Sequence, residues 1–354
     1  RKKLAVECED PVALEEPPEG LLRPMADFLE AARPLLPEGL AAHDQLYDRY
    51  FEGLNYLRVA DAFGADYRVL VAPGEKDLSV RLWCFDPARA LRAALARVRA
   101  SVLFSATLSP MDYYMRAAGL SEEEGDAALA LDSPFPRENL MACRLPVDTR
   151  YAVRQQTAPM VARVLKVMCE ARSGNYLACF PSYEYLNLTL NHFLALGTRA
   201  DVLVQRGGMS GAERTAFLER FAESPKRSML AFVVMGGVFA EGIDLPGEKL
   251  IGAAVVGVGI PQPSFEREVL RALTEDDEGE GFRVAYVYPG IERVLQAAGR
   301  VIRTETDRGV VLLLDERYQA PEYRRLLPRF WRVRPSEDQK ALTGMLRAFW
   351  DGEK

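Results

Sequence analysis

The stretch Gln296-Ala297-Ala298-Gly299-Arg300-Val301-Ile302-Arg303 lies between two apolar runs that are typical of strands, Val284–Tyr288 and Gly309–Leu314. At about 100° per residue, a helix through this stretch places the glutamine, the glycine and both arginines on one face and the apolar side chains on the other. Arginine stays charged at any working pH, and its planar fork of donors suits phosphate oxygens. The stretch therefore predicts a helix that offers an amide and two guanidiniums to a polyphosphate. An ordinary solvated helix fits the same residues, so this motif alone leaves both interpretations open.

Upstream of this stretch, helical and strand patterns alternate along the chain. Parallel strands need crossover connections, which helices usually provide, so the alternation predicts an α/β fold. We expect a RecA-like parallel sheet that is flanked by helices on both faces. The expected strands are Asn175–Phe180, Asp201–Val204, Ser228–Val234 and Leu250–Val258. The expected helices are Gln155–Arg172, which precedes the first of these strands, and Tyr185–Leu196 and Gly211–Ala222, which lie between strands.

The first third of the chain has a different pattern. Helical spacing between Leu21 and Phe63 predicts a mainly helical N-terminal segment, after an acidic, proline-rich connector. Two β-rich runs, Tyr67–Ala72 and Leu78–Cys84, predict a hairpin. A helix and a buried strand, Ser101–Phe104, are expected next. A break at Ser133-Pro134-Phe135-Pro136 completes the predicted division into residues 1–65, 66–136 and 137–354.

Composition limits the classes of protein to which the chain can belong. With 354 residues and a formal net charge of −6, the chain is long enough for two domains, and its charge neither shows nor excludes nucleic-acid binding. The two histidines are isolated, and the five cysteines are too widely spaced for a metal site or a disulfide frame. No signal-peptide pattern or long apolar run occurs. These features predict a cytoplasmic protein with reduced cysteines, no bound metal of its own and no membrane partner.

Small and polar residues follow several of the expected strands. Ser105-Ala106-Thr107 comes after the first expected buried strand, and Ser182-Tyr183 comes after Asn175–Phe180. Gly236-Gly237 and Glu241-Gly242-Ile243-Asp244 follow Ser228–Val234. Open α/β sheets bind ligands at the carboxyl ends of their strands, so these segments are candidate binding loops. Each of them singly is also a common helix cap or turn.

Taken together, five segments resemble successive motifs of superfamily 2 helicases, and most closely the DinG/XPD clade of 5′→3′ DNA helicases. The segments are Ser105–Pro110, Phe180–Tyr183, Glu241–Asp244, Gln296–Arg303 and Asp315–Tyr318. The resemblance implies a monomeric motor of the kind used in DNA repair, which moves on single-stranded DNA and uses ATP and Mg²⁺.

The resemblance also implies roles for individual residues. The motif that couples hydrolysis to movement is matched by Ser105, Ala106 and Thr107. Those implied to contact the DNA strand are Ser182, Tyr183, Gly236 and Gly237. Those implied to contact the nucleotide are Glu241, Gly242, Asp244 and Gly299. Those implied to act in catalysis are Gln296, Arg300 and Arg303, the two arginines as fingers that reach the γ-phosphate.

The sequence departs from the family pattern in its first half. It contains no G-x-x-x-x-G-K-[ST] loop, no D-E-A-H-type box and no group of four neighbouring cysteines. We therefore expect the chain to be the C-terminal portion of a helicase whose first motor domain, in the same polypeptide, holds ATP and Mg²⁺. Residues 1–65 would end an arch-like insertion, 66–136 would be the remnant of the first motor domain, and 137–354 would be the second. Alone, such a chain should hydrolyse almost no ATP. The alternative is a stand-alone nucleic-acid or protein binding module without ATPase activity.

Overall fold

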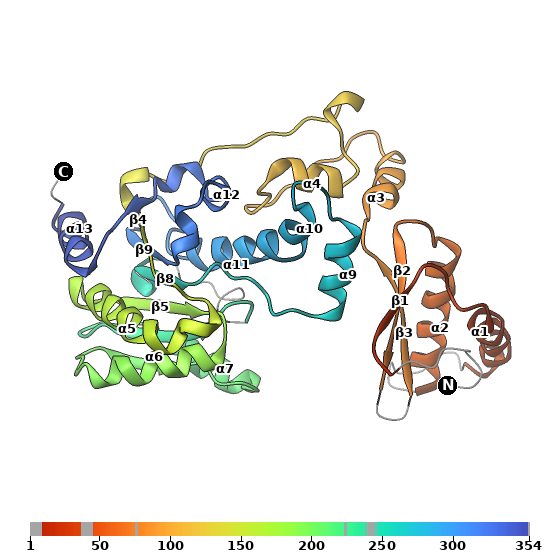
Figure 1. Ribbon diagram of the computed structural model, residues 1–354, viewed down its shortest axis with the longest axis horizontal. Coiled ribbons are helices and arrows are strands. Elements are labelled where there is room, and N and C mark those ends of the chain that lie inside the picture. The colour runs from red at the N-terminus through yellow and green to blue at the C-terminus, as the bar shows by residue number, and fades with distance from the viewer. Residues whose placement is uncertain are drawn as a thin grey trace. The chain divides into compact units, whose positions relative to one another are not determined.

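The structure is a computed structural model that describes residues 9–36, 45–74, 77–222, 225–237, 239, 245 and 247–352. The chain divides into two compact units (Figure 1). The first comprises residues 1–103, 111–128 and 263–274, and the second comprises residues 104–110, 129–262 and 275–354. The predicted boundaries near residues 65 and 136 stay predictions.

The first unit contains a three-stranded antiparallel sheet in the order β1-β2-β3. Strands β2 (Tyr67–Pro73) and β3 (Leu78–Cys84) form the expected hairpin, in a register that pairs Tyr67 with Cys84. β1 (Val12–Leu14) lies within the expected connector and adds a third strand, so that part of the connector prediction is wrong. The helices of this unit are α1 (Glu19–Ala32), α2 (Gln45–Asp61), α3 (Ala88–Leu95), α4 (Met111–Ala117) and α9 (Phe265–Leu273).

The second unit contains a seven-stranded sheet in the order β10-β4-β9-β8-β5-β7-β6, and every pair within it is parallel. This confirms the predicted RecA-like α/β fold. The strands are β4 (Leu140–Leu145), β5 (Asn175–Phe180), β6 (Asp201–Val204), β7 (Met229–Val234), β8 (Gly252–Val256), β9 (Gly309–Leu314) and β10 (Arg334–Pro335). The helices are α5 (Arg154–Ala171), α6 (Tyr183–Ala195), α7 (Gly211–Glu219), α10 (Glu280–Phe282), α11 (Tyr288–Ala298), α12 (Pro321–Arg324) and α13 (Gln339–Asp351).

Helices cover both faces of this sheet (Figure 1). On one face, α5, α6 and α13 bury a continuous apolar core that includes Tyr176, Phe180 and Leu312. On the other face, α11 packs against β8. Strands that are buried on both faces read as unbroken apolar runs rather than alternating ones, which is why the central strands were recognisable in the sequence.

The register brings the carboxyl ends of the strands to one edge. Phe180 of β5 pairs with Val234 of β7, and Leu314 of β9 pairs with both Leu145 of β4 and Val256 of β8. The loops that follow these strands therefore lie side by side. We call this side of the sheet the carboxyl edge.

The expected strand at Val284–Tyr288 is wrong. Arg283–Val287 forms a π-helix that continues directly into α11. Residues 284 to 288 are all buried, so the run is as apolar as a core strand. A short apolar run that is buried on every side carries no periodicity to separate a strand from a helix.

The expected buried strand at Ser101–Phe104 is also wrong. These residues form no strand, and the side chains of Val102 and Phe104 are 82% and 89% exposed. A strand needs a neighbour that takes up its backbone hydrogen bonds, and none of the described strands pairs with this segment. Conversely, β4 and β10 were not predicted: β4 follows the proline break at residues 133 to 136 closely, and β10 has only two residues.

None of the helices in the described ranges combines the length and the apolar composition that a membrane span requires.

Candidate functional site

A close backbone contact holds α11 at the carboxyl edge. Gly259, in the loop after β8, has a φ of +69°, and a Cβ placed there would lie 2.2 Å from the carbonyl oxygen of Gly290 in the first turn of α11. Only glycine permits this φ and this approach without strain. The helix that carries Gln296 is therefore fixed directly beside the strand-end loops.

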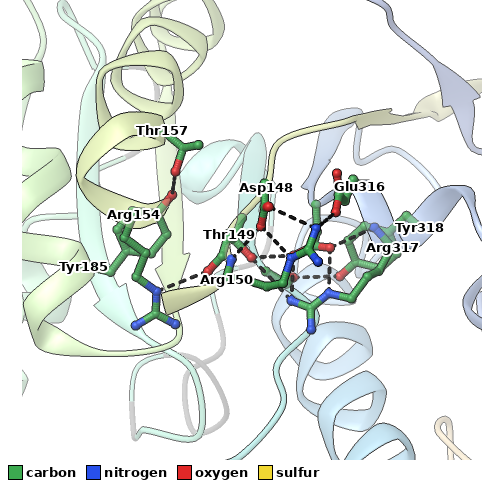
Figure 2. Close-up of polar contacts among 11 residues, drawn as sticks. Asp148, Thr149, Arg150, Arg154, Thr157, Tyr185, Glu316, Arg317 and Tyr318 are labelled. Carbon is green, nitrogen blue, oxygen red and sulfur yellow. Dashed lines mark hydrogen bonds and ion pairs between the residues drawn. The ribbon is translucent and has the colours of Figure 1, made fainter. Parts of the chain in front are cut away.

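A buried carboxylate joins two of these loops. Asp315, the residue after β9, is 1% exposed and accepts hydrogen bonds from Nε and Nη2 of Arg317, both at 2.8 Å. It also accepts from the backbone N–H of Arg317 and from the hydroxyl of Thr149, in the loop after β4 (Figure 2). Burial disfavours the charge of Arg317, but the hydrogen bonds to Asp315 and its negative charge hold the pKa of the guanidinium above its ordinary value. This pair ties the loops of β4 and β9 together.

A second arginine, Arg154 in the first turn of α5, connects the loop of β4 to the loop of β5. Its Nε donates to the carbonyl oxygen of Thr149 at 3.1 Å, and its Nη1 donates to Oγ of Ser182 at 3.4 Å. Its guanidinium lies over the rings of Tyr151 and Tyr185, 5.4 and 5.1 Å from their centroids. Burial lowers the pKa of Arg154. Ser182 in turn caps α6 by accepting from the backbone N–H of Tyr185.

Tyr183 is held at the edge by a buried amide. Gln205, directly after β6, is 6% exposed and donates from Nε2 to the hydroxyl of Tyr183 at 3.1 Å. Its Oε1 accepts from the backbone N–H of Val234, the last residue of β7, at 2.8 Å. A Cβ at Gly237 would lie 3.1 Å from the Gln205 amide nitrogen, so a side chain there would crowd this bridge. The ring of Tyr183 stays 38% exposed while its hydroxyl is anchored.

Arg293 of α11 reaches the end of β7. Gly236 has a φ of +76°, and a Cβ placed there would lie 3.3 Å from Cζ of Arg293. Gln296, one turn further along α11, donates from Nε2 to Glu292 at 3.5 Å. The guanidinium of Arg293 thus lies at the carboxyl edge.

The expected helical face with two arginines is wrong. α11 ends at Ala298, and Gly299 is its C-cap. Arg300 is 7% exposed, whereas Arg303 is exposed. Burial raises the pKa of the Cys179 thiol in β5 to about 12, and the positive charge of Arg300 opposes part of that rise.

The helix ends early for two physical reasons. Glycine is favoured at helix C-termini because it loses most entropy in a helix interior. Beyond it, the buried carboxylate of Asp307 accepts from the backbone N–H groups of Arg303 and Thr304 at 2.7 and 2.8 Å, which stabilises a turn in place of further helix.

Comparison with known proteins shows what most of the second unit is similar to. Residues 165–334 match the family model described as "Helicase C-terminal domain". The chain is 31% identical over 231 residues to a probable ATP-dependent helicase of Methanocaldococcus jannaschii, covering 60% of this chain and 34% of that protein. It is 28% identical over 250 residues to the ATP-dependent DNA helicase DinG of Photobacterium profundum, covering 67% and 35%. It is 26% identical over 268 residues to the XPD helicase subunit of the general transcription and DNA repair factor IIH of Schizosaccharomyces pombe, covering 71% and 34%.

The chain carries a DinG/XPD-like superfamily 2 helicase C-terminal portion. It spans about a third of the length of these curated relatives. Solved structures agree on the fold of this helicase portion. The apo structure of XPD matches with a TM-score of 0.56 at 19% identity, over 95% of this chain and 66% of that one. The structure of S. tokodaii Xpd4 matches with a TM-score of 0.55 at 16% identity, over 94% and 62%.

The helicase portion brings some of the predicted residues together. Ser182, Tyr183, Gly236 and Gly237 meet at the carboxyl edge through Gln205 and Arg154. Ser105 and Thr107 lie near one another, with 3.3 Å between their hydroxyl oxygens. They belong to the second unit, as does Ala106. Residues outside the described ranges are Glu241, Gly242 and Asp244.

Four residues of the helicase edge were missed in the sequence. Gln205 directly follows a correctly predicted strand, and Arg293 lies three residues before Gln296, so both carried a usable signal. Thr149 and Arg154 follow β4, which itself was not predicted. Their only signal was the run from Leu140 to Leu145.

The described residues fit only part of an ATP·Mg²⁺ site. The guanidinium of Arg303 is exposed, and Arg293 and Gln296 add donors of the kind that phosphate oxygens accept. In the described ranges, no three His, Cys, Asp or Glu side chains gather closely enough to hold a metal ion. The described residues therefore offer phosphate donors but no ligand set for Mg²⁺.

Proposed function

We propose that this chain supplies the C-terminal motor part of an ATP-dependent 5′→3′ DNA helicase that acts on single-stranded DNA. One observation carries the proposal: the segment that matches the helicase family, residues 165–334, contains the loops that follow β5, β6, β7, β8 and β9. These are the loops that meet at the carboxyl edge. The family resemblance and the place where such folds bind ligands therefore coincide.

On this proposal, the DNA strand contacts the loops after β5 and β7. Tyr183 presents an exposed ring whose orientation is fixed by Gln205, and aromatic rings of this kind stack on bases without regard to sequence. Gly236 and Gly237 leave the backbone accessible to the strand. Ser182 would add a hydroxyl contact to the DNA backbone.

The nucleotide contacts come from the end of α11 and from the loop after β7. Glu241, Gly242, Asp244 and Gly299 would line the nucleotide, and Gln296, Arg300 and Arg303 would stabilise the transferred phosphoryl group. Because Arg303 is exposed and Arg300 is buried, Arg303 is the better placed finger of the two. ATP with its Mg²⁺, bound mainly by a first motor domain of the same polypeptide, supplies the phosphoryl transfer that drives the motor. Ser105, Ala106 and Thr107 would couple hydrolysis to movement.

The remaining predictions belong to the same proposal. Residues 66–136 would be the remnant of the first motor domain, residues 1–65 would end an arch-like insertion, and the protein would act as a monomer in the cytoplasm. Free cysteines at positions 84, 143, 169 and 179 suit a reducing compartment.

The test compares ATP turnover in two polypeptides. This chain alone, with single-stranded DNA, should show almost none, and substantial turnover would contradict the proposed division of labour. In a longer polypeptide that carries a P-loop domain ahead of Arg1, Arg303→Ala should lower turnover by about 10³-fold or more, as removal of an arginine finger does. DNA affinity should stay within a few-fold.

The matched control is Arg163→Ala, which removes an exposed arginine from α5 and should leave turnover unchanged. Arg300→Ala is measured beside it with a thermal unfolding curve, because its burial predicts a loss of stability as well. Unchanged turnover in Arg303→Ala would refute the finger assignment. If no P-loop polypeptide exists and the chain binds DNA by itself, the stand-alone binding module is the correct function.

A further inference from the structure

A second arginine-rich region lies around α12, apart from the residues assigned above. It is a pocket of about 510 Å³ in the second unit. Five of its lining residues are arginines, and the others are apolar or aromatic: Arg144, Arg324, Arg325, Arg329 and Arg332, with Tyr318, Pro321, Leu327, Pro328 and Val333. A volume of this size suits a ligand as large as a nucleotide.

The charges of this pocket are unbalanced. Its lining contains no acidic residue, and Glu322 is the one carboxylate between Pro321 and Arg334. Among the described residues, none of the five guanidiniums has an ion pair or a side-chain hydrogen bond, in contrast to Arg317 a few positions earlier. Like charges that converge without partners repel one another. They are therefore arranged for a counterion that comes from outside the chain.

Two residues of the pocket lining, Tyr318 and Leu327, are buried, whereas the arginines around α12 are exposed. Tyr318 is fully buried and donates its hydroxyl to the carbonyl oxygen of Gly257 at 2.9 Å. Leu327 is also buried and lines the pocket. Arg332 has a φ of +45°, a left-handed conformation that is rare for a residue with a long side chain, and in it the residue lines the pocket.

We propose that this pocket binds phosphate groups, and we take the backbone of a single-stranded nucleic acid as their source. Guanidinium forks match phosphate oxygens in geometry as well as charge, and the apolar side chains of Leu327 and Pro328 in the pocket lining suit the uncharged part of a nucleotide. The formal net charge of the whole chain is −6, so general attraction of anions does not explain a local group of five positive charges. The site is additional to the strand contacts proposed at the carboxyl edge and does not require Arg300 or Arg303.

The test uses the full chain and two matched double variants. Arg325→Gln with Arg329→Gln removes two charges from the pocket, and Arg163→Gln with Arg347→Gln removes two exposed arginines elsewhere in the same unit. Binding of a fluorescent twelve-residue oligothymidylate is followed by anisotropy at several salt concentrations. We expect the pocket variant to lose about ten-fold or more in affinity and its salt slope to fall by about 1.4, or about 0.7 for each lost contact. The control variant should keep both values.

Two further measurements separate the sources of phosphate from other anions. Inorganic tripolyphosphate should raise the unfolding temperature of the wild type but not of the pocket variant. The Arg→Lys pair at positions 325 and 329 keeps the charge but loses the fork, and should bind with intermediate affinity. If the oligonucleotide is unaffected while the tripolyphosphate effect disappears in the pocket variant, the phosphate comes from a free polyphosphate.

Two results would overturn the proposal. One is that the pocket variant and the control variant lose the same affinity, both for the oligonucleotide and for tripolyphosphate. The other is that poly-L-glutamate competes with the oligonucleotide as well as tripolyphosphate does when both are compared at equal charge concentration. This result would show a preference for an acidic protein partner. If the pocket variant loses affinity for the oligonucleotide while Tyr183→Ala binds it normally, the pocket acts separately from the carboxyl edge.

Discussion

The carboxyl edge and the α12 pocket are both rich in arginine, but they treat its charge in opposite ways. At the edge, Arg317 pairs with the buried Asp315, and Arg154 lies against the rings of two tyrosines. In the pocket, five arginines share one cavity with no carboxylate in its lining. Both regions belong to the second unit, so the difference is not one of general environment.

The partner of an arginine therefore indicates its role better than its presence does. A paired, buried arginine stabilises the fold, because its removal leaves a buried carboxylate without a positively charged partner. An unpaired, exposed arginine contributes little to folding and can bind an external anion. The predictions below test this distinction, beginning with the largest expected effect.

The buried pair at the edge should be the most sensitive. Arg317→Ala leaves Asp315, which is 1% exposed, without its guanidinium, and we expect the free energy of unfolding to fall by about 3 kcal/mol. Urea unfolding curves measure the change. The control Arg163→Ala removes an exposed arginine and should change stability by less than about 0.5 kcal/mol.

A double variant shows whether the loss arises from the unpaired charge. Asp315→Asn combined with Arg317→Met removes both charges and should recover part of the stability lost in Arg317→Ala. If Arg317→Ala is as stable as its control, the two regions do not differ in the way we describe.

The exposed ring at the edge should matter for binding and not for folding. Tyr183→Ala removes a stacking surface, and we expect the affinity for single-stranded DNA to fall by about 1–3 kcal/mol, as measured by anisotropy. Tyr183→Phe keeps the ring but loses the hydrogen bond from Gln205, and should bind within about three-fold of the wild type. Equal losses in both variants would show that the hydroxyl, and not the ring, makes the contact.

A buried thiol in the sheet provides a third case, because burial keeps it neutral. Burial raises the pKa of the Cys143 thiol in β4 to about 11. A raised pKa in the folded state gives stability that is complete below the unfolded pKa and is lost as the pH rises above it. Between pH 9 and pH 10 the loss from this thiol should be about 1 kcal/mol, because the unfolded thiol is already partly ionised at pH 9. Cys143→Ala should reduce the difference between the unfolding free energies at the two pH values by about that amount. An unchanged difference would show that the thiol ionises normally.

Most of the second unit could be predicted from the sequence because its central strands are short, apolar and bounded by turns. Asn175–Phe180 and Gly309–Leu314 were placed to the residue. The same reasoning failed at Val284–Tyr288, where an equally apolar run is a buried helix, and at Ser101–Phe104, where no strand neighbour is described. Composition sets how apolar a segment is, but pairing partners decide whether it is a strand.

The site was predicted in part for a related reason. Residues that follow recognised strands, such as Ser182 and Gly236, do lie at the carboxyl edge. The two-arginine helix face failed because Gly299 ends the helix and Asp307 organises the turn after it. The pocket arginines follow no strand and form no motif, and only the folded chain shows that they converge on one cavity.

We expect the smallest change in stability from Arg150, which lies in the same loops as Arg317. Arg150 pairs with Asp148 and Glu316, but its side chain is 62% exposed (Figure 2). Water and salt screen such a pair, so Arg150→Gln should leave the urea midpoint unchanged within the error of repeated curves. The hydrogen bond from Arg150 lowers the pKa of Asp148, so any contribution is present at neutral pH and lost as the pH falls through that lowered pKa. If Arg150→Gln lowers the urea midpoint as far as Arg317→Ala does, the distinction between buried and exposed pairs fails. Arg150 and Arg317, which pair with the neighbouring carboxylates Glu316 and Asp315, would then stabilise the fold equally whatever their exposure.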